Sequence, residues 1–136
     1  MAQPLDIKFT AIDGRQVDLA QLRGRVVLAD FWLSTCHPCQ VEMPLCVSAF
    51  SRWHGAGVEV IGLATDQNLD DVQKFVSQYG MWWPQYCGGA NGNIFADKYN
   101  VTQVPTLWLI DKHGCLVNAT IPPSLDDEVP RLMAEQ

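Results

Sequence analysis

Two cysteines separated by two residues are the part of this sequence whose type and spacing point most directly to chemistry. They are Cys36 and Cys39, in the segment Cys36-His37-Pro38-Cys39. If a helix begins at this segment, the first thiol lies at its exposed N-terminus and the second lies one turn inward, close enough to form a disulfide. Unpaired N–H groups and the helix dipole at that end favour a thiolate. The spacing therefore predicts thiol-disulfide exchange, with Cys36 as the attacking nucleophile.

Cys39 is then expected to displace the captured substrate, and a base must accept its proton. Asp30 lies in an apolar stretch just before the motif, and Glu42 follows Cys39 by three residues, on the same helical face. Burial would raise the pKa of either carboxyl group towards the operating pH. Both also allow a structural interpretation, as a solvated glutamate and a hydrogen-bonded aspartate. His37 either adds positive charge beside the thiolate or is an exposed residue at the helix end.

The elements that must position these residues alternate between strands and helices. Residues 26–32 form a nearly continuous apolar run, which is typical of a central strand buried on both faces. Val41, Leu45, Val47 and Phe50 recur at helical spacing, and Pro44 should kink that helix. We expect a hairpin over 7–12 and 17–19, strands at 26–32, 58–64 and 107–110, and helices at 38–53 and 69–79. This order predicts an α/β fold.

The last third of the chain is less regular. Residues 88–92 are rich in glycine and indicate a loop, followed by one or two helical turns through Tyr99. Residues 112–114 predict a tight turn into a strand at 115–117. Ser124 to Asp127 can cap a final helix, which Pro130 should delay or bend. With no repeat or linker in 136 residues, we expect a single domain spanning 1–136.

Composition excludes several classes of partner. The net charge is -6 and the basic residues are not clustered, so nucleic acid is not expected as a partner. No apolar run reaches the roughly 20 residues that span a bilayer, and the first residues have neither a basic stretch nor the apolar core of a signal peptide. We expect a soluble protein whose membrane attachment, if it has one, comes from a tether outside these residues. Nothing in the sequence calls for a cofactor or a metal.

The number of cysteines is odd, so at least one of the five is unpaired or pairs between molecules. Cys46 and Cys115 are interpreted as small core side chains. A bridge between Cys87 and Cys115 is possible, and spacing alone does not decide it.

Two segments resemble the TlpA/ResA/DsbE-like thioredoxins, and the similarity runs in register from about Ile7 to Met133. Residues 31–44 are similar to the active-site segment of that family, and Val104-Pro105-Thr106 to its substrate-facing loop. The resemblance implies a thioredoxin fold, with a central mixed β-sheet flanked by helices on both faces and an N-terminal β-hairpin. It also implies that Asp30 and Glu42 are the active-site acids. The Val104-Pro105 bond is expected to be cis, with free backbone groups that pair with a substrate strand.

The resemblance further implies a function. TlpA-like proteins are usually tethered to the outer face of a bacterial inner membrane and act as reductants, for example in cytochrome maturation. We therefore expect a periplasmic or extracytoplasmic monomer that acts on protein disulfides, supplied by a membrane or soluble redox partner. Thr35 replaces the usual tryptophan and His37 the usual Gly, Glu or Pro, so substrate and direction can differ. Trp32 and the Trp82-Trp83 pair are expected near the substrate groove.

Three other classes remain as alternatives: a thiol peroxidase, a metal-binding module for zinc or copper, and a non-catalytic binding domain. A peroxiredoxin-like thiol peroxidase needs Thr or Ser three residues before its cysteine, where this sequence has Leu33. A zinc module would use Cys36 and Cys39, but no second close Cys/His pair completes four ligands. A copper carrier of the related type has three residues between its cysteines, and this chain has two. A non-catalytic binding domain would lack one or both thiols.

Overall fold

The computed structural model describes residues 3–118 and 125–135. The described residues form seven strands, four α-helices and two short 3-10 helices. The strands are β1 (Lys8–Thr10), β2 (Gln16–Asp18), β3 (Val26–Trp32), β4 (Val58–Ala64), β5 (Gln85–Cys87), β6 (Thr106–Ile110) and β7 (Leu116–Asn118). The helices are η1 (Leu19–Leu22), α1 (His37–Trp53), α2 (Leu69–Tyr79), η2 (Gly89–Asn91), α3 (Ile94–Lys98) and α4 (Leu125–Ala134).

The central sheet is mixed, as expected, and its strand order is β5-β4-β3-β6-β7. Strand β3 pairs in parallel with β4 on one side and antiparallel with β6 on the other. All seven residues of β3 are buried, which is the burial that its apolar run predicts. Strands β1 and β2 form the separate antiparallel hairpin at the N-terminal end. The predicted fold class is confirmed by this arrangement.

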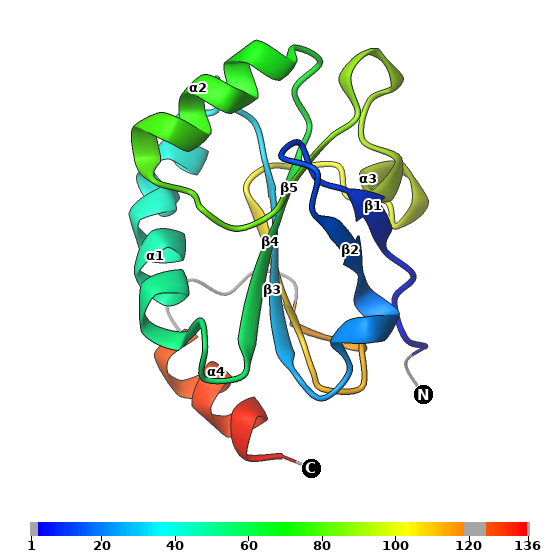
Figure 1. The fold of residues 1–136 in the computed structure, drawn as a ribbon, viewed down its shortest axis with the longest axis vertical. Helices are drawn as coiled ribbons and strands as arrows, with labels where there is room; N and C mark the ends of the chain where they lie inside the picture. Colours follow the sequence, from blue (N-terminus) through cyan, green and yellow to red (C-terminus); the bar gives the residue numbers. More distant parts are fainter. Residues whose placement is uncertain (1–2, 119–124, 136) are drawn as a thin grey trace.

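Helices cover both faces of the sheet, and the two faces have separate cores (Figure 1). One face packs against α1, α2 and α4, and the other against α3 and the β1-β2 hairpin. Side chains of a strand alternate between faces, so Leu28 and Trp32 of β3 enter the α1 core, whereas Val27 and Phe31 enter the other. Asp30 has the same parity as Leu28 and Trp32. Its carboxyl group therefore points into the layer between the sheet and α1.

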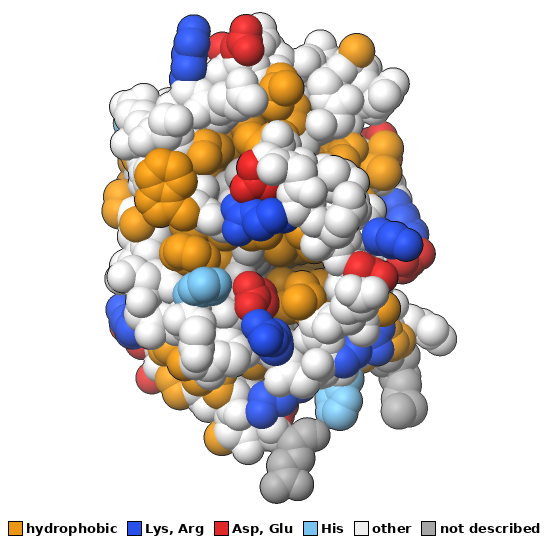
Figure 2. Space-filling view, in the orientation of Figure 1, with side chains coloured by type: hydrophobic (Ala, Val, Ile, Leu, Met, Phe, Trp, Pro, Cys, Tyr) orange, Lys and Arg blue, Asp and Glu red, His pale blue; other side chains and the backbone are white. Residues whose placement is uncertain are grey.

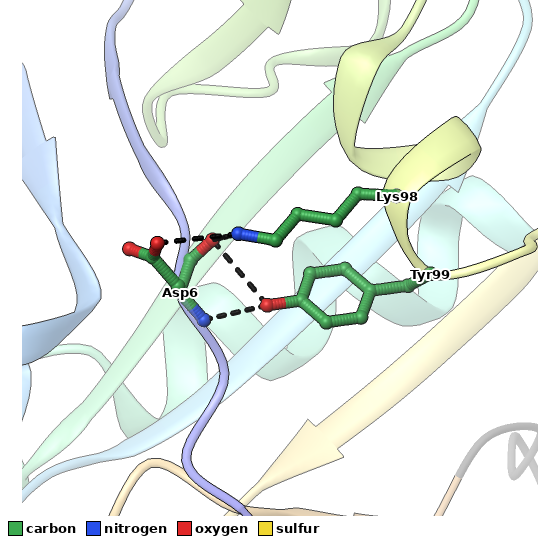
Figure 3. Close-up of polar contacts among 3 residues, drawn as sticks. All are labelled: Asp6, Lys98 and Tyr99. Atoms are coloured by element: carbon green, nitrogen blue, oxygen red, sulfur yellow. Dashed lines mark hydrogen bonds and ion pairs between the residues drawn. The ribbon is translucent and has the colours of Figure 1, made fainter.

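The segment before the hairpin is held to α3 by a small polar cluster (Figure 3). The Asp6 N–H donates to the Tyr99 hydroxyl at 2.7 Å, and Lys98 Nζ lies 3.2 Å from Asp6 Oδ2. These contacts join residues more than 90 positions apart in the chain. They anchor the first described residues to the face opposite α1.

Helix α1 buries one face against the sheet. Cys39, Met43, Cys46, Ala49 and Trp53 form its buried face, whereas Val41 is 67% exposed. Val41, one of the apolar residues at helical spacing, therefore lies on the solvent side of α1. The helix continues through Pro44, whose side chain lies on the exposed side.

The other strands and α-helices lie close to their expected bounds, and one strand was not predicted. Strand β5 was not predicted, because it is three residues long and pairs only with the end of β4. Helix α4 begins at Leu125 and contains Pro130. The predicted cap at Ser124 lies outside the described residues. In the described part of the chain, no helix has the length and apolar character required to span a bilayer.

A buried polar contact joins two strands at the top of the α1 core. Trp32 Nε1 donates to Gln85 Oε1 at 3.0 Å, and a Cβ placed on Gly62 would lie 1.8 Å from that same oxygen. Gly62→Ala should therefore displace Gln85 and leave the buried indole N–H without its acceptor. We expect the free energy of unfolding to fall by about 2 kcal/mol, measured by urea denaturation. In a Gln85→Ala background the same substitution should cost clearly less, and equal losses in both backgrounds would contradict this account.

Candidate active site

The two motif cysteines lie at the junction of β3 and α1. Cys36 is the N-cap residue of α1, and its Sγ accepts a hydrogen bond from the Cys39 N–H at 3.2 Å. Pro38 lies in the first turn, where its missing N–H leaves no helical hydrogen bond unmade. The structure therefore places the Cys36 thiol at a helix N-terminus, as the sequence predicted. A negative charge on Cys36 Sγ would be stabilised by this N–H and by the helix dipole.

The two thiols differ in access to solvent. Cys36 is half-buried and Cys39 is 1% exposed, and both are free thiols in this structure. Burial raises the pKa of the Cys39 thiol, and its interaction with Cys36 raises it further. A substrate disulfide can therefore reach Cys36 first. Cys39 needs a proton acceptor before it can attack.

The loop between β3 and α1 is held from several sides. The Ser34 N–H donates to Asp66 Oδ1 at 3.0 Å, and the Gln40 side-chain amide donates to the Ser34 carbonyl at 3.0 Å. The Cys36 N–H donates to the Leu33 carbonyl at 3.1 Å. The sequence analysis did not identify Asp66. The signal that could have identified it is its position two residues past the end of β4. These bonds keep Cys36 fixed relative to the sheet.

Val104 and Pro105 lie beside the first thiol, and the peptide bond between them is cis. Cys36 Sγ lies 3.8 Å from the Val104 carbonyl oxygen, to which its thiol donates. His37 is exposed at the start of α1. An open recess of about 570 Å³ adjoins these residues and is lined by His37, Pro38, Val41, Glu42, Leu45 and Pro105. The structure thus brings together all the predicted surface residues of the site except the tryptophans.

The tryptophan prediction needs correction. Trp32 is 0% exposed and packs against Phe75, so it contributes to the core and cannot contact a substrate in this structure. Trp83 is also buried, because both residues lie on the α1 side of the sheet. Trp82 is 62% exposed, beside the turn that follows α2.

Both predicted acids lie beneath Cys39. Asp30 is 2% exposed, and burial, reinforced by the nearby Glu42 charge, raises the pKa of its carboxyl group to about 8. Burial likewise raises the pKa of Glu42. Asp30 Oδ1 and Glu42 Oε1 are buried without a hydrogen-bond partner. An acid with these properties can accept a proton near neutral pH.

Cys46 joins this pair, which the sequence interpretation did not foresee. Its Sγ donates to Asp30 Oδ2 at 3.9 Å, and burial raises the pKa of the Cys46 thiol. The signal that could have revealed it is its spacing of seven residues from Cys39 on the same face of α1. Asp30, Glu42 and Cys46 each place one potential metal ligand within 4.8 Å of the others. Three ligands are fewer than the four of a closed zinc site, so the described residues offer an incomplete metal centre.

The bridge between Cys87 and Cys115 is not formed in this structure. The Cys87 thiol is free, and it donates to the Asp66 carbonyl oxygen at 3.7 Å.

A second hollow lies away from the thiols. It measures about 320 Å³ and opens between β2 and the C-terminal end of α1, where His54 and Phe50 line it together with Glu59. Apolar and charged side chains alternate around this region of the face shown in Figure 2. The length of α1 separates the hollow from Cys36.

Comparisons with known proteins agree with this geometry. The model of the AhpC/TSA family matches residues 2–119. The thiol-disulfide oxidoreductase ResA of Bacillus thuringiensis (strain Al Hakam) is 35% identical over 112 residues, which cover 82% of this chain and 64% of that protein. ResA of Bacillus subtilis (strain 168) is 28% identical over 105 residues, which cover 77% of this chain and 58% of that protein. The chain therefore spans less than two thirds of the curated relatives it matches.

Solved structures show the same fold. The crystal structure of a thiol:disulfide interchange protein of the thioredoxin family from Chlorobium tepidum TLS superposes with a TM-score of 0.84 at 21% identity. The match covers 98% of this chain and 97% of that one. At this identity the likeness shows a thioredoxin fold.

The burial of Asp30 predicts an unusual dependence of stability on pH. Its pKa is about 8 in the folded protein and roughly 4 in an unfolded chain. Between these values the folded state binds more protons than the unfolded state, so the free energy of unfolding falls as the pH rises. Asp30→Asn removes this titration. We expect the variant to be more stable than the parent by about 2 to 4 kcal/mol near pH 8 and nearly equal near pH 4, measured by denaturant unfolding. If the free energy of unfolding changed with pH in parallel for the parent and the variant, the raised pKa could not belong to Asp30.

Proposed function

We propose that this chain, which belongs to the AhpC/TSA family and is a TlpA/ResA/DsbE-like member of it, is a thiol-disulfide oxidoreductase working through Cys36 and Cys39. One observation carries the proposal. The accessible Cys36 caps a helix whose next turn holds a buried thiol, with carboxyl groups beneath it. The pair has the asymmetry that exchange requires, because one thiol meets the substrate and the other releases it.

The exchange proceeds in two balanced steps. The Cys36 thiolate attacks one sulfur of a substrate disulfide, and the other substrate sulfur leaves as a thiolate. Cys39 then gives its proton to the Asp30 and Glu42 pair, and its thiolate attacks Cys36 Sγ. The mixed disulfide breaks, the Cys36–Cys39 disulfide forms, and the substrate departs with both sulfurs reduced. The two electrons come from the dithiol, so a redox partner must later reduce it again.

Glu42 and Asp30 have different parts in this scheme. Glu42 lines the open recess, whereas Asp30 is enclosed between β3 and α1. Two nearby carboxyl groups do not ionise independently. Because their negative charges repel, the pair holds one shared proton more tightly than either group would alone. Glu42 can pass that proton on to solvent after Asp30 has received it.

The substrate-binding surface in this proposal is the edge formed by Val104, Pro105 and His37. An extended substrate segment can pair with free backbone groups beside the thiol, as in strand addition to a sheet. His37 is exposed next to Cys36, where its charged form favours a thiolate. The smaller Thr35, in place of the usual tryptophan, leaves more room around Cys36 for the substrate.

The proposal extends to direction and location. By its resemblance to TlpA-like proteins, we place the chain outside the cytoplasm as a reductant of protein disulfides, with cytochrome maturation as one setting. It would act as a monomer, and a membrane or soluble partner would supply its electrons. Reduction of peroxide is less well supported, since Leu33 provides no hydroxyl at the position where a peroxiredoxin has Thr or Ser.

Substitution of each cysteine tests the exchange itself. Cys36→Ser should abolish insulin disulfide reduction driven by dithiothreitol, because the attacking sulfur is lost. Cys39→Ser should instead accumulate a covalent complex with the substrate, detected by non-reducing electrophoresis, because no second thiol displaces it. Cys87→Ser is the matched control and should retain the parent rate. Multiple turnover at the parent rate by Cys39→Ser would overturn the resolving role.

The direction of electron flow has its own test. In related folds the reduction potential spans about -270 mV for reductants to about -120 mV for oxidants. We expect the Cys36–Cys39 couple to lie near the reducing end, measured by equilibration with glutathione buffers and mass spectrometry of alkylated protein. A value near the oxidising end would leave exchange intact and reverse the proposed direction.

A further inference from the structure

Cys46 has no part in the exchange scheme, yet it contacts the group that the scheme depends on. It lies on the buried face of α1 with Cys39 and Met43, and it is 2% exposed. Its Sγ lies 3.9 Å from Asp30 Oδ2, to which the thiol donates. Among the described residues it is the one hydrogen-bond donor to Asp30, since Oδ1 has no partner.

Cys46 is poorly placed to be a third redox thiol. Seven residues along a helix correspond to about 10.5 Å, whereas disulfide-linked residues have their Cα atoms about 4.4 to 6.8 Å apart. A bridge from Cys46 to Cys39 would therefore require α1 to unwind. Its burial also keeps it away from any substrate.

The surroundings of Asp30 leave few groups that could influence it. Its sheet neighbours are Gly62 on β4 and Leu107 on β6, and neither ionises. The residues that α2 and α4 bury in this core are apolar. Helix α1 supplies the titratable groups near it, which are Cys39, Glu42 and Cys46. In the proposed scheme Cys39 and Glu42 give up or pass on protons. Cys46 instead stays a thiol and donates a hydrogen bond to Asp30.

We propose that Cys46 is a positioning residue, whose thiol holds Oδ2 of Asp30 and leaves Oδ1 available to take the proton of Cys39. This inference rests on the proposed exchange function. In the resolving step the Cys39 proton passes to Oδ1, the Cys39 thiolate attacks Cys36 Sγ, and the bond from Cys36 to the substrate sulfur breaks. The Cys46 S–H bond stays intact throughout, so Cys46 is neither oxidised nor reduced.

The hydrogen bond has a definite electrostatic effect. A donor to a carboxylate stabilises the charged form, so the Cys46 thiol lowers the pKa of Asp30, while burial and Glu42 raise it more strongly. Loss of the donor should therefore make Asp30 hold its proton to higher pH. A stronger donor should have the opposite effect. Cys46 would thus set the pH range in which the enzyme can resolve its mixed disulfide.

The test is a pH profile of the resolving step in single turnover. Reduced protein is mixed with a substoichiometric peptide disulfide and quenched with acid, and mass spectrometry follows conversion of the Cys36 mixed disulfide into the Cys36–Cys39 disulfide. The parent rate should rise with pH, with a midpoint near 8 set by Asp30. Cys46→Ala and Cys46→Val both lack the donor, and should move the midpoint upward by about half a pH unit or more. Cys46→Ser keeps a donor and should move it downward or leave it in place.

Two comparisons distinguish a positioning role of Cys46 from a mere effect of its volume on core packing. Alanine and valine differ in volume, so equal upward shifts support the lost hydrogen bond. A lower rate at every pH with an unmoved midpoint would overturn the proposal. In an Asp30→Asn background the Cys46 substitutions should no longer move any midpoint, and a shift that persists there would also overturn it.

The two proposals fail in different ways. If the parent protein forms no mixed disulfide, or does not resolve one, the exchange function is wrong. If the parent resolves it with a midpoint that depends on Asp30 but not on Cys46, only the positioning role is wrong.

Discussion

A carboxyl group in the middle of a buried strand is the constraint on which this structure depends. Every other residue of β3 is apolar, and Asp30 has no sheet neighbour that can neutralise it. Such a group is costly to bury and stays protonated to unusually high pH. The fold accommodates it by packing α1 across the strand, so that the polar groups of one helix face lie opposite the carboxyl group.

The same helix carries three thiols, one accessible and two buried. Cys36 caps the first turn and is reachable from solvent, Cys39 is buried one turn later, and Cys46 lies farther along the same face. In the proposed scheme, the thiol at the surface is thereby connected to Asp30 inside the core.

Local patterns predicted most of the fold. The strands at 26–32 and 58–64 and the helix at 69–79 agree with the sequence-based bounds, because uninterrupted apolar runs and strong caps such as Asn68 and Gly80 define their ends locally. Strand β5 was missed since three residues carry no pattern of their own and depend on β4 for pairing. The spacing of Cys36 and Cys39 also predicted a thiol at a helix start, which is where Cys36 lies. The roles of Asp30 and Glu42 stay predictions.

Other features depend on how the elements pack. Helical spacing does not say which side of α1 meets the sheet, so the exposure of Val41 could not be predicted from it. Trp32 was placed at the surface because aromatic residues near a reactive thiol often contact substrates, whereas strand parity directs it inward. The role of Cys46 required knowledge that positions 30 and 46 meet across two elements.

The shortness of β5 has a consequence for the chain in concentrated solution. It pairs with β4 only from Gly62 to Ala64, so Glu59 to Ile61 lack a strand partner on that side within the described residues. Open edges of this kind invite another molecule to add a strand, which is the first step of aggregation. The Glu59 carboxylate stands on this stretch in an ion pair with Arg25. Val60 and Ile61 beside it are buried, so the charge and the cover of neighbouring side chains together make this stretch a poor template for self-association.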